Sequence, residues 1–256
     1  MNRFYQPDIA ETLTLCEDES RHAVKVLRLT EGDLIEVVDG QGTCYTMRIT
    51  LAHPKRCGLE VVKSVKVPTP WGHQIVLAVA PTKHLDRIEW AVEKCTEMGM
   101  DRFIPLHGHN SERTTLKTDR IRRVMVSAMK QSLAANLPQC DEMTSVMQVI
   151  QTPFAGQRFI AYCDAMLPRE QRRILAREYK PGSDVQMLIG PEGDFSPEEV
   201  QAALAAGFTP VTLGESRLRT ETAAVMACAT IHAMNQLKRT ASPPTPSPEG
   251  EGKLPI

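Results

Sequence analysis

Two polar segments in the C-terminal half of the chain hold the residues best suited to bind a ligand. The first is Gly190-Pro191-Glu192-Gly193, which follows the apolar run of residues 185–189. Its two glycines allow main-chain atoms to approach a ligand closely. The second is LGESRLRTETAAVMA at residues 213–227, which is crowded with arginine and glutamate. A pair of turns with good helix caps would also explain these segments, but two in succession favour a binding pocket.

Neither segment matches the common phosphate-binding motifs. The sequence lacks GxxxxGK[ST], and no GxGxxG follows the first apolar strand of this half. Loops lined by main chain can instead hold an adenosine by its base edge and ribose. Glu192 would suit a cationic ligand better than a phosphate. His107-Gly108-His109 supplies two histidines without suitably spaced acidic or thiolate partners, so we predict no metal site.

Helix signals follow both segments. Ser196 can cap a helix, Pro197 fits its first position, and Glu199 can complete a capping box. Gly207 stands where a left-handed C-terminal cap would fall, followed by an apolar Phe208. After the second segment, Thr220 is a candidate N-cap for a long alanine-rich helix.

Apolar runs and helical stretches alternate from about residue 74 onward. We expect strands near 73–80, 102–108, 158–165, 185–190 and 210–214, and helices near 84–98, 118–133, 168–179, 197–206 and 221–238. This alternation predicts an α/β domain, residues 73–238, with a parallel sheet covered on both faces. Ligands bind beyond the carboxyl ends of such strands, so the two polar segments are expected to share one pocket.

The ends of the chain differ from this pattern. Residues 1–70 resemble short strands, with a hairpin around Asp39-Gly40-Gln41-Gly42 and a further strand at 59–67, which suggests a small barrel. Residues 239–256 are rich in Pro and Ser and are expected to be disordered. The net charge is −1, the seven cysteines have no CxxC, and no apolar run approaches membrane-spanning length. We therefore expect a cytoplasmic protein that does not enter membranes.

Several ordered segments together resemble the RsmE family of 16S ribosomal RNA (uracil-N3) methyltransferases, within the SPOUT class. Residues 190–200 and 213–223 are similar to its two cofactor-loop motifs, and residues 21–42 to its N-terminal signature. Residues 86–100 are similar to its first long helix. The shorter matches are SERTT at 111–115 and AMKQS at 128–132.

The resemblance implies a SPOUT-type, trefoil-knotted parallel-sheet domain and an N-terminal PUA-like β-barrel that helps to hold RNA. It also implies a homodimer that uses S-adenosylmethionine to methylate N3 of a uridine near the decoding region of the small ribosomal subunit. The cofactor-binding candidates are Leu106, Gly190, Pro191, Glu192, Gly193, Leu213, Gly214, Leu218, Arg219 and Thr220.

The sequence departs from the family pattern in places. Asp194 stands where a third glycine is usual, and Ser216-Arg217 replaces a common pair of arginine and an aliphatic residue. Lys130 replaces an acidic residue. These changes bear on substrate contacts more than on the reaction.

Methylation at uridine N3 requires the loss of a weakly acidic proton. Glu221 is our candidate base, and Arg219 is the candidate cation for charge that develops on the uracil oxygens. A structural alternative for Glu221 is a helix-start carboxylate favoured by the helix dipole. For Arg219 the alternative is a salt-bridged loop arginine.

Basic residues supply candidate contacts to RNA phosphates. They are Arg3, His22, Arg28, Arg113, Lys117, Arg120 and Arg123. A second basic cluster at 169–180 reads more simply as a solvated helix face. Two rival functions remain open at this point: a non-catalytic RNA-binding protein with a vestigial pocket, and a nucleotide-dependent enzyme. The intact glycines oppose the first rival and the missing phosphate-binding lysine opposes the second.

Overall fold

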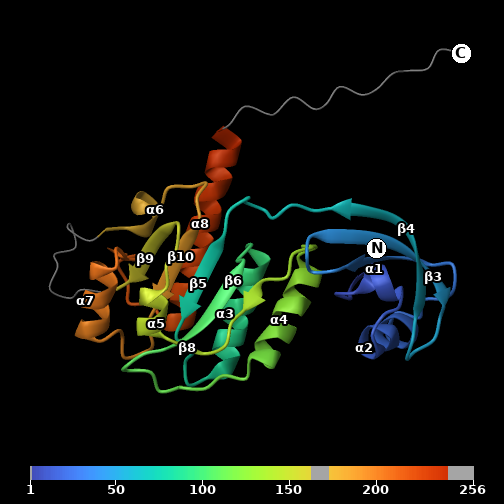
Figure 1. Ribbon diagram of the computed structural model, residues 1–256, viewed down its shortest axis with the longest axis horizontal. Coiled ribbons are helices and arrows are strands. Elements are labelled where there is room, and N and C mark those ends of the chain that lie inside the picture. Colours follow the sequence, from blue (N-terminus) through green and yellow to red (C-terminus); the bar gives the residue numbers. More distant parts are fainter. Residues whose placement is uncertain (1, 163–172, 242–256) are drawn as a thin grey trace, which may run out of the picture.

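The computed structural model describes residues 2–162 and 173–241, and these form two sheets with their helices (Figure 1). The N-terminal sheet has the order β1-β2-β3-β4, with β1 (Arg3–Tyr5) parallel to β2. The strands β2 (Leu34–Val38), β3 (Thr43–Leu51) and β4 (Gly58–Lys66) are antiparallel neighbours. The predicted hairpin and third strand are therefore confirmed.

Short helices that we had not expected lie between β1 and β2. They are α1 (Ile9–Thr12), α2 (Glu17–Arg21) and a π-helix, η1 (His22–Val26). They contribute Ile9 and Ala23 to a core that includes Phe4 and Ile35 from the sheet. The PUA-like N-terminal domain thus consists of a four-stranded β-sheet with short helices packed against it.

The C-terminal sheet has the order β11-β9-β10-β5-β6-β7, and all pairings along it are parallel. Its main strands are β5 (Ile75–Val79), β6 (Arg102–His107), β9 (Gln157–Ala161), β10 (Val185–Ile189) and β11 (Thr209–Val211). The two-residue strands β7 (Gln139–Cys140) and β8 (Thr144–Ser145) each pair with β6 and were not predicted. The parallel sheet itself is confirmed.

Helices cover both faces of this sheet. On one face, α3 (Leu85–Glu97), α4 (Thr118–Gln131), α6 (Leu175–Glu178) and α8 (Thr220–Ala241) pack on alternate residues of the strands, including Leu77 and Met187. On the other face, α5 (Val146–Gln151) and α7 (Pro197–Ala205) pack on the intervening residues, including Ala78 and Leu188. Strands buried on both sides explain why their sequences are continuously apolar.

Two expectations need correction or lie outside the structure. The helix α8 continues through Ala241, past residue 239 where we expected a disordered tail to begin, and residues 242–256 lie outside the described part. Only α6 is described within the helix expected at 168–179, because residues 163–172 are also outside. The trefoil knot stays a prediction. None of the described helices is long and apolar enough to cross a membrane.

The β2–β3 hairpin loop of the N-terminal domain contacts the segment that follows α4, and α4 lies beside that domain (Figure 1). The Gly42 amide donates to the Ala135 carbonyl at 3.0 Å, and the Leu137 amide donates to the Gly40 carbonyl at 2.9 Å. Gly40 has φ +75°, and a Cβ there would approach the Tyr5 ring to 2.9 Å. A residue with a side chain would disturb this junction. Lys130 adds an ion pair to Glu19 across it.

Candidate active site

The loops after β10 and β11 line one cavity of about 350 Å³. Both loops leave carboxyl ends of parallel strands, although β9 lies between those strands in the sheet. The first loop contributes Gly190, Pro191, Glu192 and Asp194, and the second contributes Thr212 to Gly214 and Ser216 to Glu221. The predicted shared pocket is therefore present, with a volume typical of small-molecule sites.

Local hydrogen bonds fix the first loop. The Asp194 amide donates to the Pro191 carbonyl at 3.0 Å, which closes a turn. The predicted capping box of α7 is confirmed: the Glu199 amide donates to Ser196 Oγ, and the Ser196 amide donates to Glu199 Oε2 at 2.9 Å. Glu199 also accepts the His109 amide at 2.9 Å, so α7 holds the segment after β6 against this loop.

The far end of α7 also matches its sequence signals. Gly207 has φ +89°, and the amide of the buried Phe208 donates to the Ala203 carbonyl at 2.9 Å. The predicted left-handed cap with its apolar contact is confirmed. The chain is thereby turned sharply into β11, which leads to the second loop.

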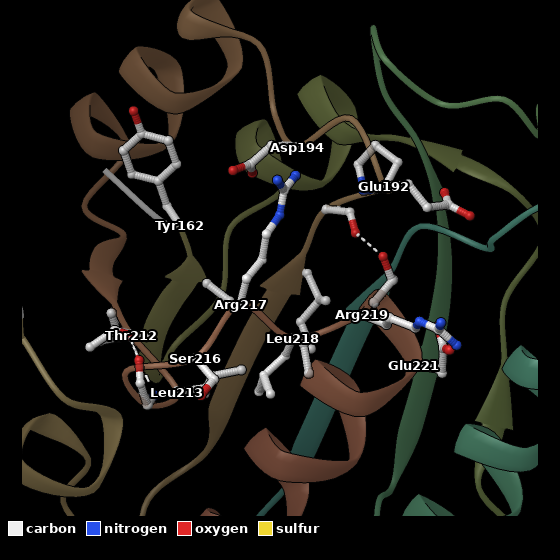
Figure 2. A pocket seen from close by; sticks show the side chains of 18 of the residues that line it. Tyr162, Glu192, Asp194, Thr212, Leu213, Ser216, Arg217, Leu218, Arg219 and Glu221 are labelled. Atoms are coloured by element: carbon white, nitrogen blue, oxygen red, sulfur yellow. Dashed lines mark hydrogen bonds between the residues drawn. The ribbon is translucent and has the colours of Figure 1, made fainter. Parts of the chain in front are cut away.

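A buried hydrogen bond ties the second loop to the first. The Thr220 hydroxyl donates to the Gly190 carbonyl at 3.0 Å (Figure 2). We expected this hydroxyl to cap α8, but Thr220 is the first residue of the helix and its side chain points to the other loop. The bond across the loops satisfies a carbonyl that would otherwise be buried without a partner.

Glu221 is the most deeply buried carboxylate of the cavity lining. Its side chain is 9% exposed, and its Oε1 lies 3.8 Å from the guanidinium of Arg87 on α3. Oε2 is buried and has no hydrogen-bond partner among the described residues. A buried carboxylate oxygen without a donor is costly, so a ligand that donates a hydrogen bond would be favoured here.

Most predicted cofactor residues lie at this cavity, and two do not. The ones at the cavity are Gly190, Pro191, Glu192, Leu213, Gly214, Leu218, Arg219 and Thr220. Leu106 is fully buried in the core beneath α5 and α7. Gly193 faces the loop after β6, where a Cβ would come within 2.9 Å of Asn110 Cβ. The absence of a side chain at residue 193 therefore allows the loops after β6 and β10 to pack together, and this residue does not line the cavity.

Several lining residues were not predicted from the sequence. Arg87 and Tyr162 come from a helix and from the end of β9, and Asp194, Thr212 and Arg217 come from the two loops. Burial raises the pKa of the Asp194 carboxyl, and the Phe195 amide and the positive charge of Arg217 oppose that rise. Asp194 and Arg217 had been noticed only as departures from a family pattern. Their position at the cavity gives them a candidate role.

The predicted RNA contacts divide into residues held by internal partners and residues that face solvent. Arg3 donates to Glu36 at 2.7 and 3.0 Å and to the Ala134 carbonyl, and its side chain is 10% exposed. Arg113 donates to the carbonyls of Thr82 and Lys83. Arg120 pairs with Glu89, although its side chain is 60% exposed. His22, Arg28, Lys117 and Arg123 are exposed.

We expect Arg3→Gln to act on stability and not directly on RNA. Loss of its charge leaves Glu36 partly buried without a partner, and the free energy of unfolding should fall by about 1–3 kcal/mol. Arg28→Gln is the matched control, and it should leave stability unchanged and weaken RNA binding. Urea unfolding and RNA binding at several salt concentrations measure both effects. Weaker RNA binding by a fully stable Arg3→Gln protein would contradict this assignment.

Comparison with known proteins supports the arrangement. A family model described as an RNA methyltransferase domain matches residues 69–232, and one described as an RNA methyltransferase PUA domain matches residues 15–62. The Ribosomal RNA small subunit methyltransferase E of Synechocystis is 30% identical over 233 residues, which cover 88% of this chain and 74% of the relative.

Solved structures agree with the same assignment. A probable rRNA-methyltransferase from Porphyromonas gingivalis is 43% identical, with a TM-score of 0.88 over 93% of this chain and 100% of that one. The Ribosomal RNA small subunit methyltransferase E of Neisseria gonorrhoeae, bound to S-adenosyl methionine, is 27% identical. Its TM-score is 0.77 over 93% of this chain and 98% of that one. Among the described residues of the present chain, no group of three or more His, Cys, Asp or Glu is arranged to hold a metal ion.

Proposed function

The chain belongs to the RsmE family of S-adenosylmethionine-dependent ribosomal RNA methyltransferases, and we propose that the cavity between its two loops binds that cofactor. The cavity suits the molecule in two respects. Its volume is that of a small-ligand site, and its walls combine apolar side chains with main chain at Gly190 and Gly214. The observation that carries the proposal is the convergence of both loops on this single cavity.

The protein methylates 16S ribosomal RNA, and we propose N3 of a uridine near the decoding region as its target. S-adenosylmethionine supplies an electrophilic methyl group on a positively charged sulfur. Glu221 accepts the N3 proton, so that the nitrogen gains the electron pair needed to form the new bond to the methyl carbon. Arg219 stabilises the negative charge on the uracil oxygens.

Glu221 is suited to this task by its surroundings. Arg87 lies 3.8 Å from Oε1, while Oε2 has no donor among the described residues. A proton on uracil N3 would satisfy that oxygen. Arg219 is exposed and precedes Glu221 by two positions, with both side chains on the same side of the view in Figure 2. A planar uracil could therefore meet a base and a cation from one short segment.

The reaction is tested directly with methyl-labelled cofactor. Small ribosomal subunits from cells that lack this modification are incubated with the protein, and the RNA is digested to nucleosides. We expect the label in N3-methyluridine and in no other nucleoside. Label on a carbon or a ribose would overturn the proposed target atom, and absence of label would overturn the activity.

We further propose that the protein acts as a homodimer in the cytoplasm, where its ribosomal substrate resides. Trp90 on α3 and Met226 on α8 are 46% and 41% exposed, and these two helices pack against each other. Trp90 follows the cavity-lining residue Arg87 by three positions, and Met226 follows Ala223 by three. Residues at this spacing lie on the same face of a helix. Exposed large apolar side chains next to a site are typical of an interface.

Sedimentation tests the dimer. The wild-type protein should sediment at twice the 28.5 kDa of one chain, and Trp90→Glu should shift it toward the single-chain mass because a charge would be buried in the interface. A wild-type protein that stays at the single-chain mass at high concentration would contradict this proposal.

A further inference from the structure

Asp194 and Arg217 bring opposite charges to one side of the cavity from different loops. Asp194 ends the turn of the first loop and Arg217 lies in the second, and both line the cavity. In Figure 2 the Arg217 side chain extends toward Asp194, whereas Glu221 lies on the other side of the view. The cavity therefore has a second charged end besides the one formed by Arg87 and Glu221.

The Asp194 carboxylate is held in a defined position. Its backbone has φ +63°, which few residues other than glycine adopt readily, although Asp tolerates it. The Asn110 amide group donates to the Gly193 and Asp194 carbonyls at 3.1 Å each, and the Phe195 amide donates to Asp194 Oδ1 at 2.8 Å. An unfavourable backbone conformation that is held by several hydrogen bonds is a feature of functional sites.

The two charges interact without forming a contact. No ion pair within 4.0 Å joins Asp194 to Arg217 or to any other described residue, although the Arg217 charge lowers the pKa that burial has raised. Arg87 and Glu221, by contrast, are joined at 3.8 Å. An opposed carboxylate and guanidinium that remain apart can admit a ligand that has both charges.

We propose that Asp194 and Arg217 bind the amino-acid end of S-adenosylmethionine, the carboxylate accepting from its α-ammonium and the guanidinium donating to its α-carboxylate. This inference rests on the proposed function of the cavity. The adenosine end then lies against Leu213, Leu218 and the main chain at Gly190, where the walls are apolar or carry peptide groups. A guanidinium and a carboxylate are well suited to the two groups of a zwitterion.

Three ligands separate this role from a general effect on the cavity. S-adenosylmethionine and S-adenosylhomocysteine have the amino-acid end, and methylthioadenosine lacks it. Calorimetry on the full chain should show that Asp194→Asn and Arg217→Gln each lower the affinity for S-adenosylmethionine and S-adenosylhomocysteine about tenfold, because a charge-assisted hydrogen bond is lost. Affinity for methylthioadenosine should change by less than about twofold, since that ligand makes neither contact.

The reference variant is Thr220→Val, which removes the hydrogen bond between the two loops and should lower the affinity for all three ligands by the same factor. If Asp194→Asn or Arg217→Gln lowers the affinity for methylthioadenosine as much as that for the other two ligands, the inference is overturned. Unchanged affinity for all three ligands would also overturn it. Arg217→Gln that keeps cofactor affinity and loses RNA affinity would assign Arg217 to RNA and overturn it as well. A wild-type protein that binds none of the ligands would overturn the proposed cavity function itself.

Discussion

Glu221→Gln is expected to lower turnover by roughly two to four orders of magnitude, the usual contribution of a positioned general base. Glutamine keeps the size of the side chain and can still meet Arg87, but it cannot accept a proton. Cofactor affinity should stay within about threefold, because the variant removes no contact that we assign to the cofactor. Single-turnover methylation of small subunits measures the rate, and calorimetry measures the affinity.

The pH dependence distinguishes a missing base from a distorted site. Uracil N3 ionises without help as pH rises, so the residual rate of Glu221→Gln should increase with pH more steeply than that of the wild type. Glu215→Gln is the matched control, since Glu215 is in the same loop but not in the cavity lining. Wild-type turnover in Glu221→Gln, with unaltered cofactor affinity, would show that another group takes the proton.

Thr220→Val should weaken cofactor binding roughly 10- to 100-fold, because the buried Gly190 carbonyl loses its donor and the two loops lose their link. Valine has nearly the same shape as threonine, so packing around α8 should be kept. Calorimetry should show that the affinities for S-adenosylmethionine and for methylthioadenosine fall by the same factor. Thermal unfolding should detect only a modest loss of stability.

Thr222→Val is the control for this substitution. Thr222 lies in the same turn of α8, outside the cavity lining. It should bind all ligands with wild-type affinity. If Thr220→Val also binds normally, the hydrogen bond between the loops does not shape the ligand site, and the cavity walls must be held by other contacts.

Local signals allowed much of the fold to be predicted. The strand, turn and helix from Val185 to Ala205 follow residue by residue from apolar content, a glycine turn and a capping box, all of which act over a few positions. The hairpin at residues 39–42 was predicted for the same reason. By contrast, α5 and the strands β7 and β8 are so short that no periodicity reveals them.

Contacts between distant segments could not be predicted. Gly40 was recognised as a turn residue, but its role at the domain junction depends on Tyr5 and on residues 135–137, which approach only in the folded chain. Arg3 was predicted to contact RNA phosphates because of its positive charge. In the structure, Glu36 lies opposite it in the neighbouring strand and forms an ion pair with it. A charge whose partner is 33 positions away cannot be distinguished in the sequence from a free one.

The candidate site was predicted in outline and not in its charges. Loop glycines identified the two walls, because backbone requirements leave a mark on residue type. Arg87 was missed because it belongs to an ordinary amphipathic helix, and its meeting with Glu221 depends on how α3 packs against α8. Asp194 and Arg217 were noticed only as unusual residues, since their opposition across a cavity is a property of the fold.

Amide hydrogen exchange, with and without S-adenosylmethionine, tests the central claim most directly. If the cavity between the loops binds the cofactor, protection should rise in residues 190–195 and 212–221 and remain unchanged in the N-terminal sheet. Protection confined to other segments, at a cofactor concentration where calorimetry proves binding, would place the cofactor elsewhere and contradict the account.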